Sequence, residues 1–178
     1  MPRKCFYQIF VFISIFLHTN VCLQAQDDFS IVFIHIGDKI PVYAETALLQ
    51  ARTFNPNCPI IMLTNEKAMR DFTLKDPNAN ITFISCESLT KSVQHKRFIK
   101  KTKWNPGFMR YTSERFLYLC DLMIQHNLQN IFHLEYDNML YVDLSELFPV
   151  FKNLYKGIAA TFDNDQRCIP GFVFISNK

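Results

Sequence analysis

Apolar, β-rich runs alternate with helix-forming segments along this chain of 178 residues. The first run, at residues 30–37, is continuously apolar and ends in Gly37, which is typical of a strand buried on both faces of a parallel sheet. Further strands are predicted within residues 59–65, 79–89, 130–142, 158–163 and 170–177, and helices at 44–54, 66–74, 109–127 and 144–155. This order predicts an α/β fold in which a mixed, mostly parallel sheet carries helices on both faces.

The segment at residues 109–127 has the clearest helical pattern, because its apolar residues recur at nearly helical spacing. The residues on this face are Met109, Phe116, Leu119, Cys120 and Met123. Thr112 or Ser113 is expected to cap the start of this helix. The preceding residues 92–107 are polar and basic, and we expect a loop there, either solvated or closing over phosphates. Pro149 is expected to interrupt the helix at residues 144–155.

Glu135 and Asp137 interrupt an apolar run at residues 131–144, where unpaired carboxylates would be costly if they were buried. We therefore expect the strand to leave the core at this point. Ligands of parallel α/β sheets bind beyond the carboxyl ends of the strands. Two carboxylates separated by one residue can there reach one hard divalent cation, Mn²⁺ or Mg²⁺, which prefers oxygen ligands. The alternative is a solvated turn at Asp137 and Asn138.

The order of elements and the motif Glu135-Tyr136-Asp137 together resemble the front half of a nucleotide-sugar-dependent glycosyltransferase of the GT-A fold. Such enzymes carry a DxD motif after an apolar strand, and here Ile131, Phe132 and Leu134 precede the motif. The later sequence IPGFVFIS resembles the family's strand that lines the donor-sugar pocket. The resemblance covers residues 30–178 and implies a Rossmann-like, GT-A-type sheet that binds a nucleotide-diphosphate sugar.

The resemblance also implies roles for individual residues. Asp137, helped by Glu135, would hold Mn²⁺ or Mg²⁺ against the diphosphate, and Asp137 is expected to be the firmer ligand because Glu replaces the usual first Asp. The residues expected to contact the nucleotide are Gly37, Thr64, Asn65, Arg110, Arg115 and Glu135. The alternatives are ordinary turn chemistry for the first three, and surface ion pairs with Glu114 or Asp121 for the two arginines.

Two other polar residues near the motif have expected structural roles. Asp143 precedes a helix-forming segment and is expected to cap it. His133 lies within the apolar strand and is expected to be a buried, hydrogen-bonded side chain rather than a ligand.

Residues 1–25 follow the plan of a secretory signal peptide, with a short basic start, an apolar run and a polar region. An uncleaved signal anchor is the alternative, and in that case the chain would be held at a membrane. Both predict an extracytoplasmic location, in the lumen of the secretory pathway or outside the cell. Without Arg3 and Lys4, 17 basic residues face 16 acidic ones, so the net charge gives no indication of nucleic-acid binding.

Residues 28–178 are expected to form one nucleotide-sugar-binding domain, incomplete at its C-terminus because no helix follows the last predicted strand. Its four cysteines allow either one or two disulfides or buried thiols. Two functions remain open. The first is a metal-assisted glycosyltransferase with an unknown acceptor, and the second is an inactive secreted relative that binds a glycan or a partner protein.

Overall fold

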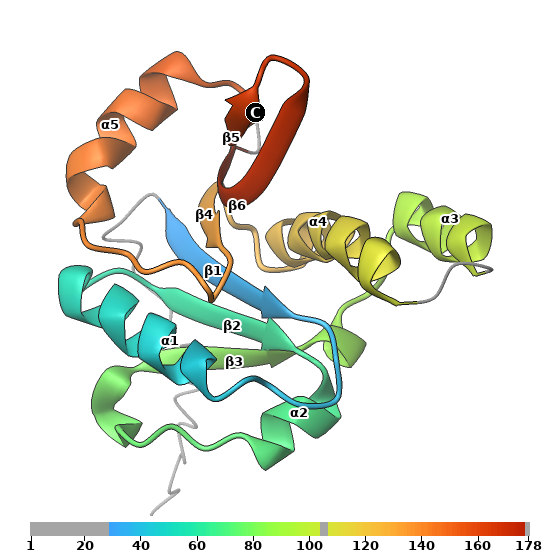
Figure 1. Cartoon of the computed structure of the whole chain (residues 1–178), viewed down its shortest axis with the longest axis horizontal. Coiled ribbons are helices and arrows are strands. Elements are labelled where there is room, and N and C mark those ends of the chain that lie inside the picture. The colour runs from blue at the N-terminus through green and yellow to red at the C-terminus, as the bar shows by residue number, and fades with distance from the viewer. Residues whose placement is uncertain (1–28, 104–106, 177–178) are drawn as a thin grey trace, which may run out of the picture.

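A computed structural model describes residues 29–103 and 107–176 (Figure 1). The strands are β1 (Ser30–His35), β2 (Ile60–Thr64), β3 (Ile81–Ser85), β4 (Asn130–Leu134), β5 (Ile158–Asn164) and β6 (Arg167–Ser176). The helices are α1 (Tyr43–Phe54), α2 (Glu66–Asp71), α3 (Val93–Thr102), α4 (Phe108–Gln125) and α5 (Leu144–Leu154). Two 3₁₀ turns, η1 (Pro77–Ala79) and η2 (Cys86–Ser88), flank β3.

The strands form one six-stranded sheet in the order β3-β2-β1-β4-β6-β5. The first four strands in this order are parallel, and β6 and β5 run antiparallel to their neighbours. In Figure 1 the arrows of β1, β2 and β3 all point toward the side of the molecule on which α3 lies. The prediction of a mixed, mostly parallel α/β sheet is therefore confirmed.

Alternate side chains of the central strands enter two hydrophobic cores, one on each face of the sheet. Phe33 and Phe132 point into the core covered by α1 and α5, where Leu48 and Phe148 meet them. Val32, on the opposite face, belongs to the core that α4 covers. Each fully buried Leu or Phe side chain contributes about 2 kcal/mol of transfer free energy. Helices therefore cover both faces of the sheet, as the sequence predicts.

The basic stretch at residues 92–107 forms helix α3 rather than the expected loop. Ser92 caps the helix, since its hydroxyl accepts a hydrogen bond from the backbone N–H of His95 at 3.2 Å. The face that packs against α4 consists of His95, Phe98, Ile99 and Thr102, which recur at helical spacing. The prediction was wrong because the basic residues occupy only the outward face of the helix, while buried His95 and the half-buried Phe98 and Ile99 lie on the other face. Residues 104–106 lie outside the described residues, as does the predicted signal peptide or anchor.

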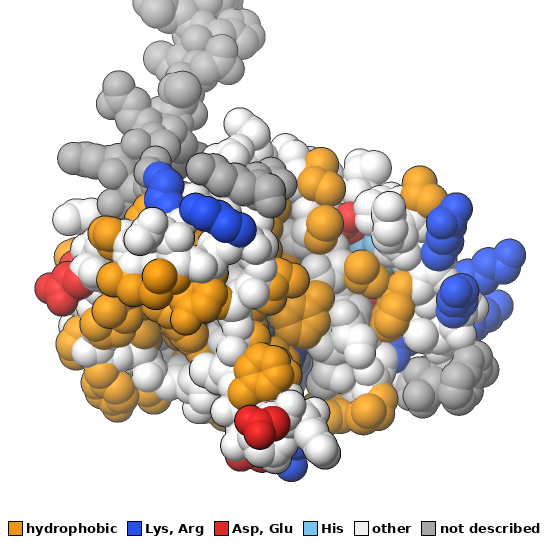
Figure 2. Space-filling view, turned by 90° about the horizontal axis from the view of Figure 1, so that it is seen from above, with side chains coloured by type: hydrophobic (Ala, Val, Ile, Leu, Met, Phe, Trp, Pro, Cys, Tyr) orange, Lys and Arg blue, Asp and Glu red, His pale blue; other side chains and the backbone are white. Residues whose placement is uncertain are grey.

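The outward face of α3 is strongly basic. Its exposed cations, together with the residue that follows the helix, are Lys96, Arg97, Lys100, Lys101 and Lys103. Figure 2 shows Lys and Arg side chains gathered at the right-hand edge of the molecule, where α3 lies in Figure 1. The charge run is thus one face of a helix whose other face is packed.

Helix α4 begins at Phe108, after Gly107 at φ 105°. The expected cap at Thr112 or Ser113 is wrong, because both hydroxyls donate to the carbonyl of Met109 inside the helix. The predicted apolar face is only partly correct. Leu119 and Met123 are buried, but Met109 and Cys120 are exposed. The polar side chains of Glu114 and Asp121 are buried instead, against α3.

Asp143 caps α5 as predicted, since its carboxylate accepts a hydrogen bond from the N–H of Ser145 at 2.9 Å. The helix continues through Pro149 to Leu154, so the expected interruption does not occur. Proline removes one backbone donor, and packing of Phe148 and Phe151 around Phe132 accompanies the continuous helix.

None of the helices in residues 29–103 and 107–176 combines the length and apolar content needed to cross a membrane.

Candidate functional site

A pocket of about 310 Å³ opens where the carboxyl ends of β1 and β4 meet the start of α4. Its lining combines charged side chains with aromatic ones. The lining residues are Ile34, His35, Ile36, Tyr43, Phe108, Tyr111, Thr112, Arg115, Glu135, Tyr136 and Asp137. This is the end of a parallel sheet at which ligands bind in α/β proteins.

The motif Glu135-Tyr136-Asp137 follows β4 directly and lies in a turn that is fastened to β6. Glu135 N donates to the carbonyl of Gly171 at 2.9 Å, and the side-chain amide of Asn138 donates to the same carbonyl at 2.9 Å. Asn138 N also donates to the carbonyl of Glu135 at 3.0 Å. The strand therefore leaves the sheet at the predicted point, and Asp137 is exposed at the pocket.

Glu135 forms an ion pair with Arg115, which extends from α4 across the pocket. The contact joins Nη1 of the guanidinium to Oε1 of the carboxylate. The Arg115 side chain is 13% exposed and that of Glu135 is 31% exposed, so the pair is partly shielded from solvent. One end of the pocket thus holds a guanidinium beside two carboxylates.

The middle residue of the motif, Tyr136, connects β4 to β1. Its hydroxyl lies 2.9 Å from Nδ1 of His35, and its ring centroid lies 5.8 Å from that of Tyr43. Burial lowers the pKa of His35, against the opposing effect of a hydrogen bond with the Lys39 backbone. Burial also raises the pKa of Tyr136, with the nearby Tyr43 adding to the shift. At neutral pH both side chains are uncharged.

Gly37, Thr64 and Asn65 lie at the carboxyl ends of β1 and β2, as predicted, but do not line the pocket. Asn65 Oδ1 accepts a hydrogen bond from Gly37 N at 2.7 Å, and its amide donates to Glu87 at 2.8 Å. Thr64 is buried. The hydrogen bond between Gly37 and Asn65 joins the segments that follow β1 and β2, and direct contact of the three residues with a nucleotide stays a prediction.

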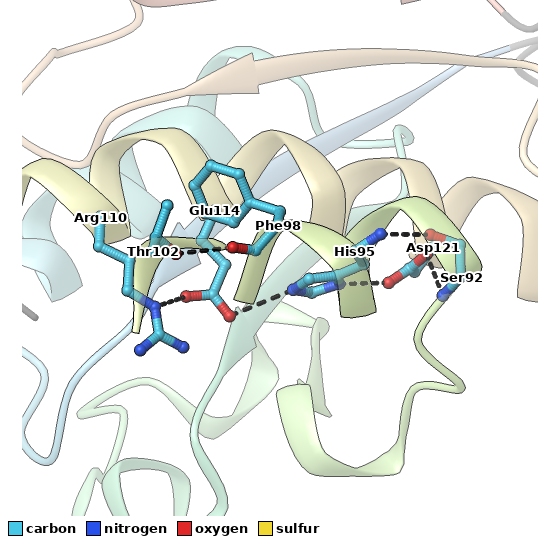
Figure 3. A network of polar contacts seen from close by, with 7 residues as sticks. All are labelled: Ser92, His95, Phe98, Thr102, Arg110, Glu114 and Asp121. Carbon is cyan, nitrogen blue, oxygen red and sulfur yellow. Dashed lines mark hydrogen bonds and ion pairs between the residues drawn. The ribbon is translucent and has the colours of Figure 1, made fainter. Parts of the chain in front are cut away.

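Arg110 points away from the pocket, toward α3. Its Nε donates to Glu114 at 3.0 Å, and Glu114 in turn meets His95 (Figure 3). Arg110 therefore forms the ion pair with Glu114, which was the alternative to nucleotide contact that the sequence analysis gave for the two arginines. The other, Arg115, is brought to the motif.

Several lining residues were not predicted, and a helical pattern could have grouped some of them. Phe108, Tyr111, Thr112 and Arg115 are spaced three, four and seven residues from the first, which places them on one face of α4. His35 is the last residue of β1 and so occupies a strand end. Their side chains line the pocket together with the acidic motif.

The donor set for a cation consists of the two carboxylates of the motif. In residues 29–103 and 107–176, no group of three or more His, Cys, Asp or Glu side chains could hold a metal ion. Mg²⁺ sites commonly use only one or two protein carboxylates, with water and phosphate oxygens as the remaining ligands. Exposed Asp137 next to Glu135 fits that kind of site.

Comparisons with known proteins support the fold. No protein-family model matches the chain, and no curated protein matches its sequence. The solved structures that match its fold include the apo form of mouse xyloside xylosyltransferase 1, with a TM-score of 0.51, and PaToxG glycosyltransferase, with a TM-score of 0.57, each at 11% identity. The matches cover 83% and 84% of this chain, but 67% and 54% of the other two.

The α/β fold is therefore of the Rossmann-like GT-A type. At this level of identity the likeness establishes the fold alone. The chain spans about half the length of PaToxG glycosyltransferase.

Proposed function

We propose that the pocket binds a nucleotide-diphosphate sugar and that the chain is part of a glycosyltransferase acting on an unknown acceptor. One observation carries the proposal: Glu135, Asp137 and Arg115 converge on one pocket at the carboxyl end of a GT-A-type sheet. Two of the solved structures that share this fold are named as glycosyltransferases.

The charge of the pocket supports a requirement for a divalent cation. Among the described lining residues, Glu135 and Asp137 are anionic and Arg115 is cationic, while His35 is neutral at pH 7 because burial lowers its pKa. The lining therefore carries a net charge of about −1, which repels a free diphosphate. Asp137, assisted by Glu135, would hold Mn²⁺ or Mg²⁺, which would neutralise the charge that develops on the leaving diphosphate.

The aromatic wall supports the binding of a flat or ring-shaped ligand. Tyr43, Phe108 and Tyr111 expose more than a third of their surface at the pocket. Aromatic faces stack on planar rings and cover the apolar faces of sugars, while a few polar groups fix the orientation. A nucleotide sugar offers both kinds of surface.

The proposal extends to the rest of the chain. Residues 28–178 would form the nucleotide-sugar-binding part, and residues 1–25 would direct it to the lumen of the secretory pathway or outside the cell. The acceptor and the stereochemical outcome of transfer are left open.

The proposal can be tested by thermal unfolding in the presence of UDP, GDP or CDP, each with and without Mn²⁺. We expect one nucleotide to raise the Tm only when Mn²⁺ is present, and Asp137→Asn to abolish that rise. Asp165→Asn, which removes an exposed carboxylate from the β5–β6 turn, is the matched control and should respond like the wild type. A rise that persists in Asp137→Asn, or the absence of any rise, would refute the proposal.

A further inference from the structure

The sequence contains one acceptor motif for N-glycosylation, Asn80-Ile81-Thr82. The structure places it between η1 and β3, with Asn80 and Thr82 both exposed. None of the other asparagines up to Asn164 has a Ser or Thr two positions later. Asn80 is therefore the acceptor asparagine that this motif identifies, and its side chain is accessible.

The backbone of Asn80 takes part in a hydrogen bond of the fold, whereas its side chain is accessible for modification. The carbonyl of Asn80 accepts a hydrogen bond from Nη2 of Arg52 at 2.9 Å. Its backbone is left-handed, with φ 49°, a conformation that Asn adopts more readily than most residues. Within the described residues the Asn80 side chain takes no part in a recorded hydrogen bond or ion pair. A group added to its amide nitrogen would therefore displace no hydrogen bond or ion pair among the described residues.

The position is also remote from the candidate site. Asn80 precedes the amino end of β3, whereas the pocket lies at the carboxyl ends of β1 and β4. Five steps of about 3.3 Å separate Asn80 from Ser85, at the carboxyl end of β3, by roughly 16 Å. In addition, β3 is the outer strand on its side of the sheet, and among the described strands it pairs with β2 alone. A bulky substituent at Asn80 leaves the pocket open and covers the start of this edge.

We propose that Asn80 is N-glycosylated when the chain enters a eukaryotic secretory pathway. The donor class is a lipid-linked diphosphate oligosaccharide. The amide nitrogen of Asn80 forms a bond to the anomeric carbon, the bond from that carbon to the diphosphate oxygen breaks, the lipid diphosphate departs, and the amide loses one proton. This modification does not depend on the proposed glycosyltransferase activity.

The test expresses the full chain, with its own N-terminus, in cultured eukaryotic cells and treats it with peptide N-glycosidase. We expect the wild type to lose the mass of one glycan, with Asn80 converted to Asp in the released peptide. Asn80→Gln and Thr82→Ala should show no loss. Thr82→Ser, which keeps the motif, and Asn78→Gln, which alters a nearby exposed Asn outside it, should behave like the wild type.

The paired changes at Thr82 separate a lost motif from a lost fold, because both shorten the same side chain on the same strand. The proposal would be overturned if the wild-type chain carried no glycan. It would also be overturned if Asn80→Gln still carried the glycan. A glycan found in Thr82→Ala at the level of Thr82→Ser would overturn it as well.

Discussion

His95 Nδ1 lies 2.6 Å from Asp121 Oδ2, inside the interface of α3 and α4 (Figure 3). The other ring nitrogen lies 3.1 Å from Glu114, so one buried imidazole meets a buried carboxylate on each side. The backbone N–H of Ser92 donates to Asp121 at 3.0 Å, and Arg110 meets Glu114 at the other end. This chain of polar contacts joins the basic helix α3 to α4 through its one buried side chain, His95.

Replacing His95 by Leu should therefore lower the free energy of unfolding by about 3–5 kcal/mol, because two buried carboxylates lose a partner. Urea unfolding followed by circular dichroism measures the change. Lys96→Leu, at the next and exposed position of α3, is the control and should change stability by less than about 0.5 kcal/mol. Equal effects of the two substitutions would show that the network does not hold α3.

His133 should make the protein less stable in mild acid. Burial lowers its pKa to about 4, with the charge of Arg115 contributing, although the hydrogen bond to the Val32 carbonyl at 2.9 Å opposes the shift. The unfolded chain thus binds the proton more readily than the folded one between about pH 4 and pH 6.5. The stabilisation is complete above that window and is lost as the pH falls through it.

The expected loss from this group between pH 7 and pH 5 is about 2 kcal/mol. Urea unfolding of His133→Asn, whose amide can still donate to the Val32 carbonyl, should show a pH dependence weaker than that of the wild type by this amount. His126→Asn, at the exposed end of α4, is the matched control and should leave the dependence unchanged. An identical slope in His133→Asn and the wild type would contradict the assignment.

Gly171→Ala should disturb the acidic motif from the neighbouring strand. A Cβ on Gly171 would lie 2.6 Å from the Asn138 amide nitrogen and 3.4 Å from Glu135 Oε2, so the Asn138 side chain must shift and its hydrogen bond to the Gly171 carbonyl is disturbed. We expect a loss of about 1–3 kcal/mol in unfolding free energy together with weaker nucleotide binding. Adding Asn138→Ala removes the clashing amide, so the double variant should lose less than the sum of the single losses. Strict additivity would count against this contact.

Arg115→Ala should weaken nucleotide binding in the presence of Mn²⁺ by tenfold or more. The substitution removes the positively charged side chain found among the described lining residues and leaves Glu135 without its ion-pair partner. Isothermal titration calorimetry measures the Kd. Arg110→Ala is the matched control, because it removes an arginine from the same helix that contacts Glu114 instead. It should lower stability and leave the Kd unchanged. The reverse pattern would assign the nucleotide contact to Arg110.

The strands were predictable because their stability comes from continuous apolar runs that the sequence displays directly. Val32 and Phe33, for example, point to opposite cores of a doubly covered sheet. Helix α3 was not predictable in this way. The residue that anchors it, His95, depends on an aspartate 26 positions later, and nothing local marks that partner.

In the candidate site, too, features marked by local sequence were predicted and features that depend on distant residues were not. The acidic motif was predicted because charge after an apolar strand is locally unusual. The link between Tyr136 and His35 was missed because it joins residues 101 positions apart. The arginines were left unresolved for a related reason, since the direction of a side chain on α4 depends on how the helix packs on the sheet.

The pairing of β1 with β4 has a consequence for the newly made chain. Val32 and His133 are register partners, although about a hundred residues separate them. At a synthesis rate of about 5–20 residues per second, β1 waits roughly 5–20 seconds for this neighbour after leaving the ribosome. During that time β2 can pair with one edge of β1 and β3 can pair with β2, while the other edge of β1 stays unpaired. We therefore expect the nascent chain to be a substrate for chaperones until β4 emerges.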